Sequence, residues 1–299
     1  SQVLIFNDTF GALSTHFCLP LEENNASAIN VHCVNDSYIS HQGIRYNIEQ
    51  NQLDGSNIQH LNCSEALPKN ADIVLFKIPK SKSLLIEQLI NIKNTVSQQV
   101  VFIAADRAKD IHSSTLKLFE KYLGPTTTSL AVKKARLVFC QLDSDSPSLS
   151  PQQSPFPTKW TMHNKALARD FIISNHANVY SREKLDIGGR YFIENLPKIK
   201  ANSQVIDLGC GNGVVGLSVL ACEPSVQIQF FDESHMAITS AEQNITTNLP
   251  ELINQCQFHL NDCLTNVDSN SVDLILCNPP FHQQSATTDH IAWQMFKDS

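Results

Sequence analysis

Short apolar runs alternate with longer amphipathic stretches along both halves of the chain. Such alternation is typical of βαβ units whose strands form a parallel sheet. Between the halves, residues 144–158 are rich in proline, serine and glutamine and show no apolar periodicity, which indicates an exposed linker. The pattern therefore predicts an α/β protein with one domain over residues 1–143 and a second over 159–299.

The two halves also resemble each other. Residues 3–13 match residues 205–215, and residues 71–79 match residues 272–280 at nearly the same separation along the chain. Matches at a constant separation predict a duplicated domain.

The N-terminal copy lacks the chemistry-bearing residues of the other copy. It has no glycines at the positions of Gly209 and Gly211, and Lys77 stands where the C-terminal copy has Asn278. We therefore expect a degenerate N-terminal domain that holds the substrate and a C-terminal domain that carries the chemistry.

A glycine-rich turn follows a strand-like run in the C-terminal half. Residues 204–208 form a buried-strand pattern, the turn covers 209–213, and apolar residues suited to a helix follow from 214 to 220. In doubly wound sheets, ligands bind at the carboxyl ends of strands, where glycines let the backbone approach them. Asp207 precedes the first glycine, and a carboxylate there suits a cationic, amine-bearing ligand better than a pyrophosphate. This favours S-adenosylmethionine over NAD as the cofactor. The candidate cofactor-binding residues of the turn are Asp207, Gly209, Gly211, Asn212 and Gly213.

Acidic residues end the next two predicted strands. The run 226–231 ends in Asp232, which lies about 20 residues after the turn, where an acidic side chain can accept hydrogen bonds from both ribose hydroxyls. The run 257–260 is followed by Asp262, which could meet the adenine amino group. The alternative for Asp232 is a helix N-cap ahead of residues 236–244, and Asp262 could equally cap a helix.

A fourth predicted strand, 272–277, leads into the sequence Asn278-Pro279-Pro280-Phe281. An exocyclic amine on a base is a weak nucleophile, because its lone pair is delocalised into the ring. The Asn278 side-chain oxygen and the Pro279 carbonyl could accept its two hydrogens and stabilise the charge that develops during methyl transfer. The prolines fix the turn, and Phe281 offers a flat face for an extruded base. The alternative is an ordinary Pro-Pro turn with Phe281 in the core.

With these motifs the chain resembles the class I RNA methyltransferases of the small-domain type. It is most similar to bacterial ribosomal RNA guanine-N2 methyltransferases of the large-subunit type, with the small-subunit type next. The resemblance rests on residues 178–188, 207–213, 231–234 and 278–284 and covers essentially the whole chain.

The resemblance implies a fold of two tandem class I methyltransferase-like, Rossmann-like domains, the first without a working cofactor site. It implies methyl transfer to guanine N2 of 23S ribosomal RNA, preferably protein-free, with Asn278 at the target amine. It further implies that residues 178–188, including Asp186, help to close over the cofactor and that His282 binds substrate. Alternatively, this segment leads into a helix that Asp186 caps.

The charge distribution changes the picture of the N-terminal half. The whole chain has a net charge of −7, which would normally discourage a nucleic-acid partner. Residues 69–136, however, hold twelve basic and five acidic residues, whereas residues 151–299 hold nine basic and fifteen acidic ones. We therefore expect the basic stretch to contact RNA, with Lys133, Lys134 and Arg136 as candidate substrate-binding residues. A solvated face with many ion pairs is the alternative.

Other features exclude several classes of protein. Nine cysteines without a Cys-x-x-Cys pair favour free thiols in a reducing cytoplasm over disulfides, and no metal site is expected. No apolar run reaches the roughly 20 residues that span a bilayer, and the N-terminus lacks a signal-peptide pattern. We therefore expect a cytoplasmic protein.

The chain ends at Ser299, shortly after the fourth strand of the second domain. A seven-stranded domain would need roughly 60 to 80 further residues at average element lengths. A protein that truly ended here would expose a sheet edge, and we expect it to be less stable or less active.

Two further hypotheses remain open at this point. The Asn-Pro-Pro-Phe sequence also suits methylation of 16S ribosomal RNA, of adenine N6 or of a protein glutamine. A protein of another class, an RNA-binding assembly factor with a vestigial cofactor pocket, would also have this sequence pattern.

Overall fold

The computed structural model describes residues 1–19, 29–142, 152–164, 167–279 and 289–299. The chain divides into two compact units, Ser1–Pro155 and Phe156–Ser299, and this boundary falls within the predicted linker. Within the described ranges, no helix combines the length and the apolar character that a membrane crossing requires.

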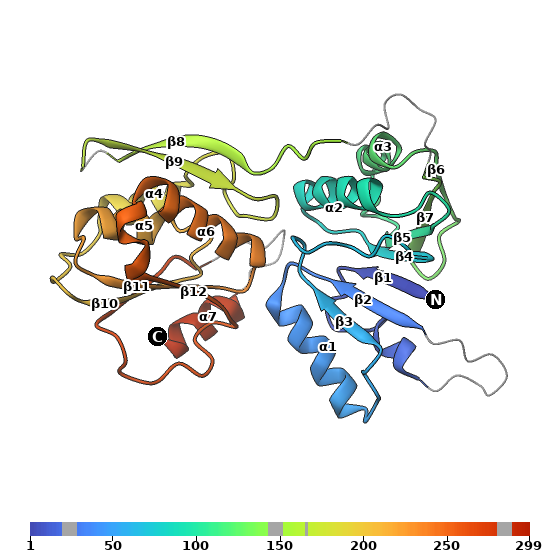
Figure 1. Cartoon of the computed structure of the whole chain (residues 1–299), viewed down its shortest axis with the longest axis horizontal. Coiled ribbons are helices and arrows are strands. Elements are labelled where there is room, and N and C mark those ends of the chain that lie inside the picture. The colour runs from blue at the N-terminus through green and yellow to red at the C-terminus, as the bar shows by residue number, and fades with distance from the viewer. Residues whose placement is uncertain (20–28, 143–151, 165–166, 280–288) are drawn as a thin grey trace. The chain divides into compact units, whose positions relative to one another are not determined.

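In unit 1 the described residues form a seven-stranded sheet with the order β3-β2-β1-β4-β5-β7-β6 (Figure 1). The strands β1 to β5 are parallel, and β7 pairs antiparallel with both β5 and β6. Helix α1 lies on one face, and α2 and α3 lie on the other. The elements are β1 (Gln2–Phe6), η1 (Thr15–Cys18), β2 (Asn30–Val34), α1 (Tyr38–Gln50), β3 (Ile58–Leu61), β4 (Ile73–Lys77), α2 (Lys82–Thr95), β5 (Val101–Arg107), α3 (Ser113–Tyr122), β6 (Thr126–Thr128) and β7 (Ala135–Cys140).

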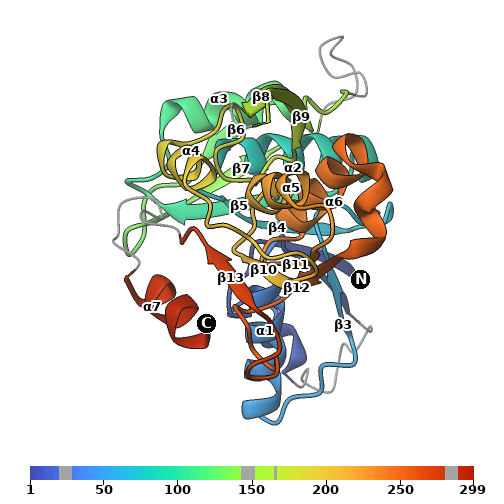
Figure 2. The ribbon, with the colours of Figure 1, turned by 90° about the vertical axis from the view of Figure 1, so that its left-hand side faces the viewer.

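In unit 2 the described residues form a four-stranded parallel sheet with the order β12-β11-β10-β13 and a separate antiparallel ribbon, β8-β9. Helices α4 and α5 lie on one face of the sheet and α7 on the other (Figure 2). The elements are β8 (Thr158–Asn164), β9 (Arg169–Asn175), α4 (Ile187–Glu194), β10 (Gln204–Leu208), α5 (Val214–Cys222), β11 (Gln227–Asp232), α6 (His235–Asn248), η3 (Pro250–Gln255), β12 (Cys256–Leu260), β13 (Leu274–Cys277) and α7 (Asp289–Asp298).

The two sheets share one arrangement, β3-β2-β1-β4 in unit 1 and β12-β11-β10-β13 in unit 2. Val3 of β1 pairs with Ile73 of β4. Their counterparts in the sequence match, Val205 of β10 and Leu274 of β13, pair in the same way. The register of the central strands therefore confirms the predicted fold of two tandem, related domains.

The two units also have the same hydrogen bonds at the start of these strands. In unit 1, the Gln2 backbone N–H donates to Asp72 Oδ2 at 2.8 Å, and the Asp72 N–H donates to the Gln2 carbonyl at 2.9 Å. In unit 2, Gln204 and Asp273 make the same two bonds at 2.8 and 2.9 Å. The duplication therefore extends to individual side-chain contacts.

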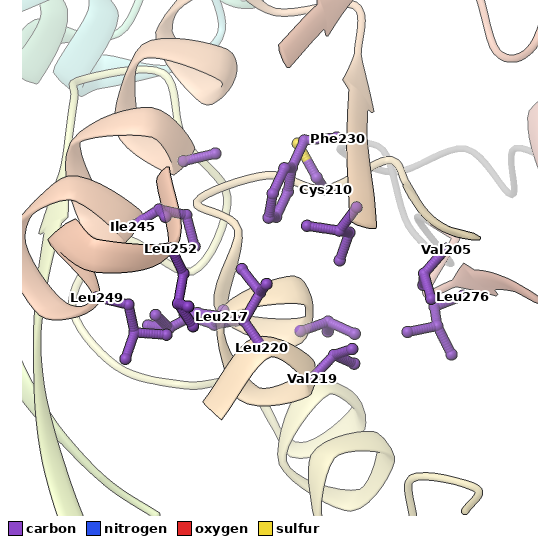
Figure 3. Close-up of a cluster of buried hydrophobic side chains, with 14 of the residues drawn as sticks. Val205, Cys210, Leu217, Val219, Leu220, Phe230, Ile245, Leu249, Leu252 and Leu276 are labelled. Carbon is purple, nitrogen blue, oxygen red and sulfur yellow. The ribbon is translucent and has the colours of Figure 1, made fainter. Parts of the chain in front are cut away.

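The main core of unit 2 lies between its sheet and the helices α5 and α6 (Figure 3). Side chains from the sheet and from both helices meet there. They include Val205 and Phe230 from the sheet, Leu217 and Leu220 from α5 and Ile245 from α6. Residues 214–220 of α5 are all buried, which explains why their sequence is apolar except for Ser218. This packing fixes the position of the turn that joins β10 to α5.

Candidate functional site

The turn after β10 places three glycines in the left-handed region, with φ of +66° at Gly209, +54° at Gly211 and +74° at Gly213. The backbone N–H groups of Gly209 and Cys210 donate to the Phe231 carbonyl at 2.8 and 3.0 Å, so the turn is tied to the neighbouring strand β11. A side chain at these positions would be strained by the backbone alone. The turn therefore requires the glycines that the sequence provides.

Gly211 and Gly213 differ in what surrounds them. Among the residues that the structure describes, a Cβ added to Gly211 would meet no atom within 4 Å, so this part of the turn is open toward them. A Cβ added to Gly213 would lie 2.9 Å from the Cβ of Ala241 in α6. Gly213 is therefore required by helix packing, whereas Gly211 leaves room for a ligand against the backbone.

Asp207 is the last-but-one residue of β10, and its side chain is only 3% exposed. Its Oδ2 accepts a 2.8 Å hydrogen bond from the backbone N–H of Gly216 in the first turn of α5. Burial raises the pKa of Asp207 to about 7, the Gly216 hydrogen bond partly opposes this, and the nearby Asp232 carboxylate adds to the rise. A cationic group at this point would stabilise the charged form of the carboxyl.

Asp232 ends the neighbouring strand β11 and faces the same turn. Its Oδ2 accepts a 2.9 Å hydrogen bond from the Gly211 N–H, and its Oδ1 accepts one of 2.9 Å from the Ser234 N–H. The N-cap of α6 is Ser234, whose hydroxyl accepts from the Ala237 N–H at 3.1 Å. The alternative that Asp232 caps this helix is therefore wrong.

Asp262 follows β12 and contacts α7, where Gln294 Nε2 donates to its Oδ1 at 3.2 Å. The segment between β12 and β13 lies within the described residues and contains no helix, so Asp262 does not cap one. Asp207, Asp232 and Asp262 thus lie at or just after the carboxyl ends of three adjacent strands, β10, β11 and β12, at one edge of the sheet.

Asn278 follows β13, the fourth strand at this edge, and is close to the start of α4. A Cβ added to Gly188 of α4 would lie 3.7 Å from Asn278 Oδ1. Asp186 is the N-cap of α4, and its Oδ2 accepts from the Gly189 N–H at 3.1 Å. The capping alternative for Asp186 is therefore confirmed, and the segment that precedes β10 in the chain lies beside Asn278.

The rest of the Asn-Pro-Pro-Phe sequence is only partly described. Pro279 is buried. Pro280, Phe281 and His282 lie outside the described residues. The roles predicted for these three residues therefore stay predictions.

Asn212 takes part in a buried network that the sequence analysis missed. Its Nδ2 donates to Asn175 Oδ1 at 2.7 Å, and its carbonyl accepts from Asn244 Nδ2 at 2.9 Å. Asn244 also exchanges two hydrogen bonds with the backbone of Ser174 in β9, at 2.7 and 3.0 Å. Asn212 therefore anchors the turn to β9 through its side chain and to α6 through its backbone carbonyl. The available signal was polar residues at 240, 244 and 248, which share one face of an otherwise ordinary helix.

The equivalent turn of unit 1 is filled by its own side chains. Asn7, at the position of Gly209, keeps a left-handed φ of +60°, and its Nδ2 donates to the Lys77 carbonyl at 2.9 Å. Thr9 stands at the position of Gly211, and Lys77 Nζ donates to its hydroxyl at 2.8 Å. A hydrogen bond between side chains thus spans the place that is open in unit 2.

The basic candidates Lys133, Lys134 and Arg136 belong to unit 1. Val132 and Ala135 exchange two backbone hydrogen bonds of 2.9 Å, so the two lysines form the tip of a two-residue hairpin. Both lysines are exposed and left-handed, with φ of +47° and +68°. Side chains at such a tip point into solvent and are available to a partner.

Comparison with known proteins identifies both parts of the chain. The model described as "RLMG N-terminal domain" matches residues 1–144, and that described as "Methyltransferase small domain" matches residues 170–299. A protein of Colwellia psychrerythraea named ribosomal RNA large subunit methyltransferase G is 64% identical over 303 residues, which cover 100% of this chain and 75% of that protein. The protein of the same name from Aeromonas salmonicida is 47% identical over 99% of this chain and 74% of its own length.

A solved structure shares the fold of the described chain. The T. thermophilus 16S rRNA N2 G1207 methyltransferase RsmC, in complex with AdoMet and guanosine, aligns with a TM-score of 0.74 at 16% identity. The alignment covers 99% of this chain and 74% of the RsmC chain. At this identity the likeness shows the fold.

Proposed function

The chain belongs to the ribosomal RNA large subunit methyltransferase G family, and we propose that it methylates the exocyclic N2 amine of a guanine in 23S ribosomal RNA. The observation that carries the proposal is the position of Asn278. It follows β13, at the same edge of the sheet as the open glycine turn and the acidic residues after β10 and β11. A group held by Asn278 would therefore stand beside a ligand held by that turn.

The residues at this edge fit S-adenosylmethionine. The open space at Gly211 admits a ligand against the backbone, and Asp207 and Asp232 offer carboxylates to an amine and to ribose hydroxyls. When bound, the cofactor supplies an electrophilic methyl group on a sulfonium. The residues that would hold it are Asp207, Gly209, Gly211, Asn212, Gly213, Asp232 and Asp262, together with Asp186, whose carboxylate also caps α4.

Asn278 and Pro279 would act on the target amine. The Asn278 Oδ1 and the Pro279 carbonyl accept the two amine hydrogens, which draws the nitrogen towards tetrahedral geometry and frees its lone pair. The same two acceptors stabilise the positive charge that develops on the nitrogen. Because Pro279 is buried and fixes the backbone, the acceptors keep their direction without reorganising. Pro280 and Phe281 are the residues that the sequence predicts to stiffen this turn and to stack on the base.

Unit 1 would hold the rest of the substrate. Its exposed hairpin with Lys133 and Lys134, together with Arg136, supplies positive charge to the phosphates of protein-free 23S ribosomal RNA. The self-filled turn of unit 1 supports a binding rather than a catalytic role. A ribosomal RNA substrate implies action in the cytoplasm, and the proposed chemistry needs no metal.

The test is methyl transfer from labelled S-adenosylmethionine to unmethylated 23S and 16S ribosomal RNA transcripts and to a peptide release factor, measured side by side. We expect label in 23S RNA, recovered after digestion as N2-methylguanosine. Label in 16S RNA, in N6-methyladenosine or in protein glutamine would replace the proposed substrate with that one. Binding of 23S RNA without transfer to any substrate would favour the assembly factor.

A further inference from the structure

Helix α4 carries apolar side chains on two opposite sides. Phe192 and Ile193 pack against the main core of unit 2. Ile187 and Tyr191, one helical turn apart, point the other way and are 90% and 70% exposed. Arg190 is also exposed and lies on the same side. These residues (Ile187, Arg190 and Tyr191) are called the α4 stripe below. Large apolar side chains on the solvent side of a helix mark an interaction surface.

The α4 stripe begins beside the proposed catalytic residue. Ile187 is the first residue of α4, next to Gly188, whose added Cβ would lie 3.7 Å from Asn278 Oδ1. From this point the stripe extends along the helix by one turn, about 5.4 Å, to Tyr191. A substrate whose reacting base lies at Asn278 would therefore have the groups next to that base within reach of the stripe.

The chain segment that carries the stripe, residues 182–200, has a net positive charge within an acidic unit 2, which points to a polyanion. Residues 151–299 hold nine lysines and arginines, and five of them lie between residues 182 and 200, against three acidic residues in the same segment. The remainder of unit 2 is strongly acidic. An arginine between exposed apolar and aromatic side chains is the combination that binds splayed bases and their phosphates in single-stranded RNA.

We propose that the α4 stripe binds the nucleotides next to the target base in single-stranded RNA. Tyr191 stacks on a neighbouring base, Ile187 packs against the sugar or base edge nearest the target, and Arg190 contacts the phosphate between them. The inference rests on the proposed function, and it adds the requirement that the target lies in an unpaired segment, whose neighbours are free to unstack.

The experiment compares Tyr191→Ala with two controls. Tyr191→Phe keeps the stacking ring, and Tyr46→Ala removes an equally prominent tyrosine, 60% exposed, from α1 of unit 1. Each variant is assayed with unmethylated 23S RNA for KM and kcat and by calorimetry for S-adenosylmethionine affinity. We expect Tyr191→Ala to raise KM for RNA roughly 5- to 150-fold, the range for losing one stacked base, with cofactor affinity unchanged. Tyr191→Phe and Tyr46→Ala should behave as the wild type.

A second measurement distinguishes the inference from the proposed function. Arg190→Gln should weaken RNA binding and reduce its salt dependence by about one phosphate contact. If the wild type methylates 23S RNA and neither Tyr191→Ala nor Arg190→Gln changes KM for RNA, the inference fails while the proposed function stands. If Tyr191→Ala instead lowers the melting temperature or dissolves a dimer seen by sedimentation, polypeptide covers the stripe and the inference is overturned.

Discussion

The Asp232 carboxylate accepts a 2.9 Å hydrogen bond from the Gly211 backbone N–H, which joins the end of β11 to the glycine turn after β10. Its other oxygen accepts from the Ser234 N–H. An ionised carboxylate has about four acceptor positions in all. One side chain therefore sets the shape of the turn and offers acceptors at the proposed ribose position.

Asp232→Ala should weaken S-adenosylmethionine binding by roughly 10- to 100-fold, because it removes charge-assisted hydrogen bonds from both the ligand and the turn. The matched control is Asp268→Ala, which removes an exposed carboxylate elsewhere in unit 2. Isothermal titration calorimetry of both variants measures the dissociation constants. An unchanged constant for Asp232→Ala would contradict the ribose assignment.

Two glycines of one turn allow ligand binding and packing to be tested separately. Gly213→Ala should lower the melting temperature strongly, because its Cβ would collide with Ala241 at 2.9 Å and the residue is left-handed. Gly211→Ala should cost only about 1–2 kcal/mol of stability, for the left-handed backbone alone, yet reduce cofactor affinity by filling the open space. Thermal unfolding with and without S-adenosylmethionine separates the two effects. Equal losses of stability would show that Gly211 also has a packing role.

The sequence predicted the parts of the site that depend on local chemistry and chain order. A parallel sheet with the order β12-β11-β10-β13 brings the strand ends together, so residues far apart in the chain share one edge. Asp207, Asp232 and Asn278 could therefore be assigned to one place before the structure was known. The roles assigned to them in binding and catalysis stay predictions.

Contacts between side chains of different helices, strands and turns could not be predicted from the sequence. The hydrogen bond of Asn212 to Asn175 depends on how β9 packs against the turn, and no local pattern specifies that distance. The close approach of the Gly188 backbone to the Asn278 side chain has the same origin. In unit 1, the missing glycines were evident, but the hydrogen bond from Lys77 to Thr9 required the tertiary structure.

The affinity for S-adenosylmethionine should depend on pH through Asp207. Its folded pKa of about 7 lies above the ordinary value of 3.8, so the carboxyl is protonated below pH 7 and a cationic ligand favours the ionised form. Affinity should therefore rise about tenfold from pH 5.5 to 7, below the range in which a free α-amine titrates. In the absence of ligand, the free energy of unfolding should fall with rising pH over the same range, since the folded state holds the proton more tightly. Asp207→Asn should flatten both profiles, and a pH-independent dissociation constant in the wild type would contradict the assignment.

Charge reversal at Lys133, Lys134 and Arg136 should weaken 23S RNA binding and flatten its dependence on salt. The logarithm of the RNA-binding constant falls linearly with the logarithm of the salt concentration. Each phosphate contact that is lost makes this slope shallower by about 0.7 to 0.9. Filter binding at several salt concentrations measures the slope. Lys297→Glu, which reverses an exposed charge in unit 2, is the control. If the triple variant keeps the wild-type slope, RNA does not contact the hairpin of unit 1.

Asn278→Ala should reduce kcat by about two to three orders of magnitude, as expected when one preorganised transition-state acceptor is removed. The dissociation constant for S-adenosylmethionine should stay within twofold, because Asp207, Asp232 and the glycine turn remain. Asn278→Gln tests position: it keeps the amide but moves it outward by one methylene, and misplacement of about 1 Å is enough to cost roughly a hundredfold. Single-turnover assays with saturating RNA separate the chemical step from binding. Turnover equal to the wild type in both variants would remove Asn278 from the mechanism, whereas loss in Ala with full activity in Gln would show that the amide acts without fixed geometry.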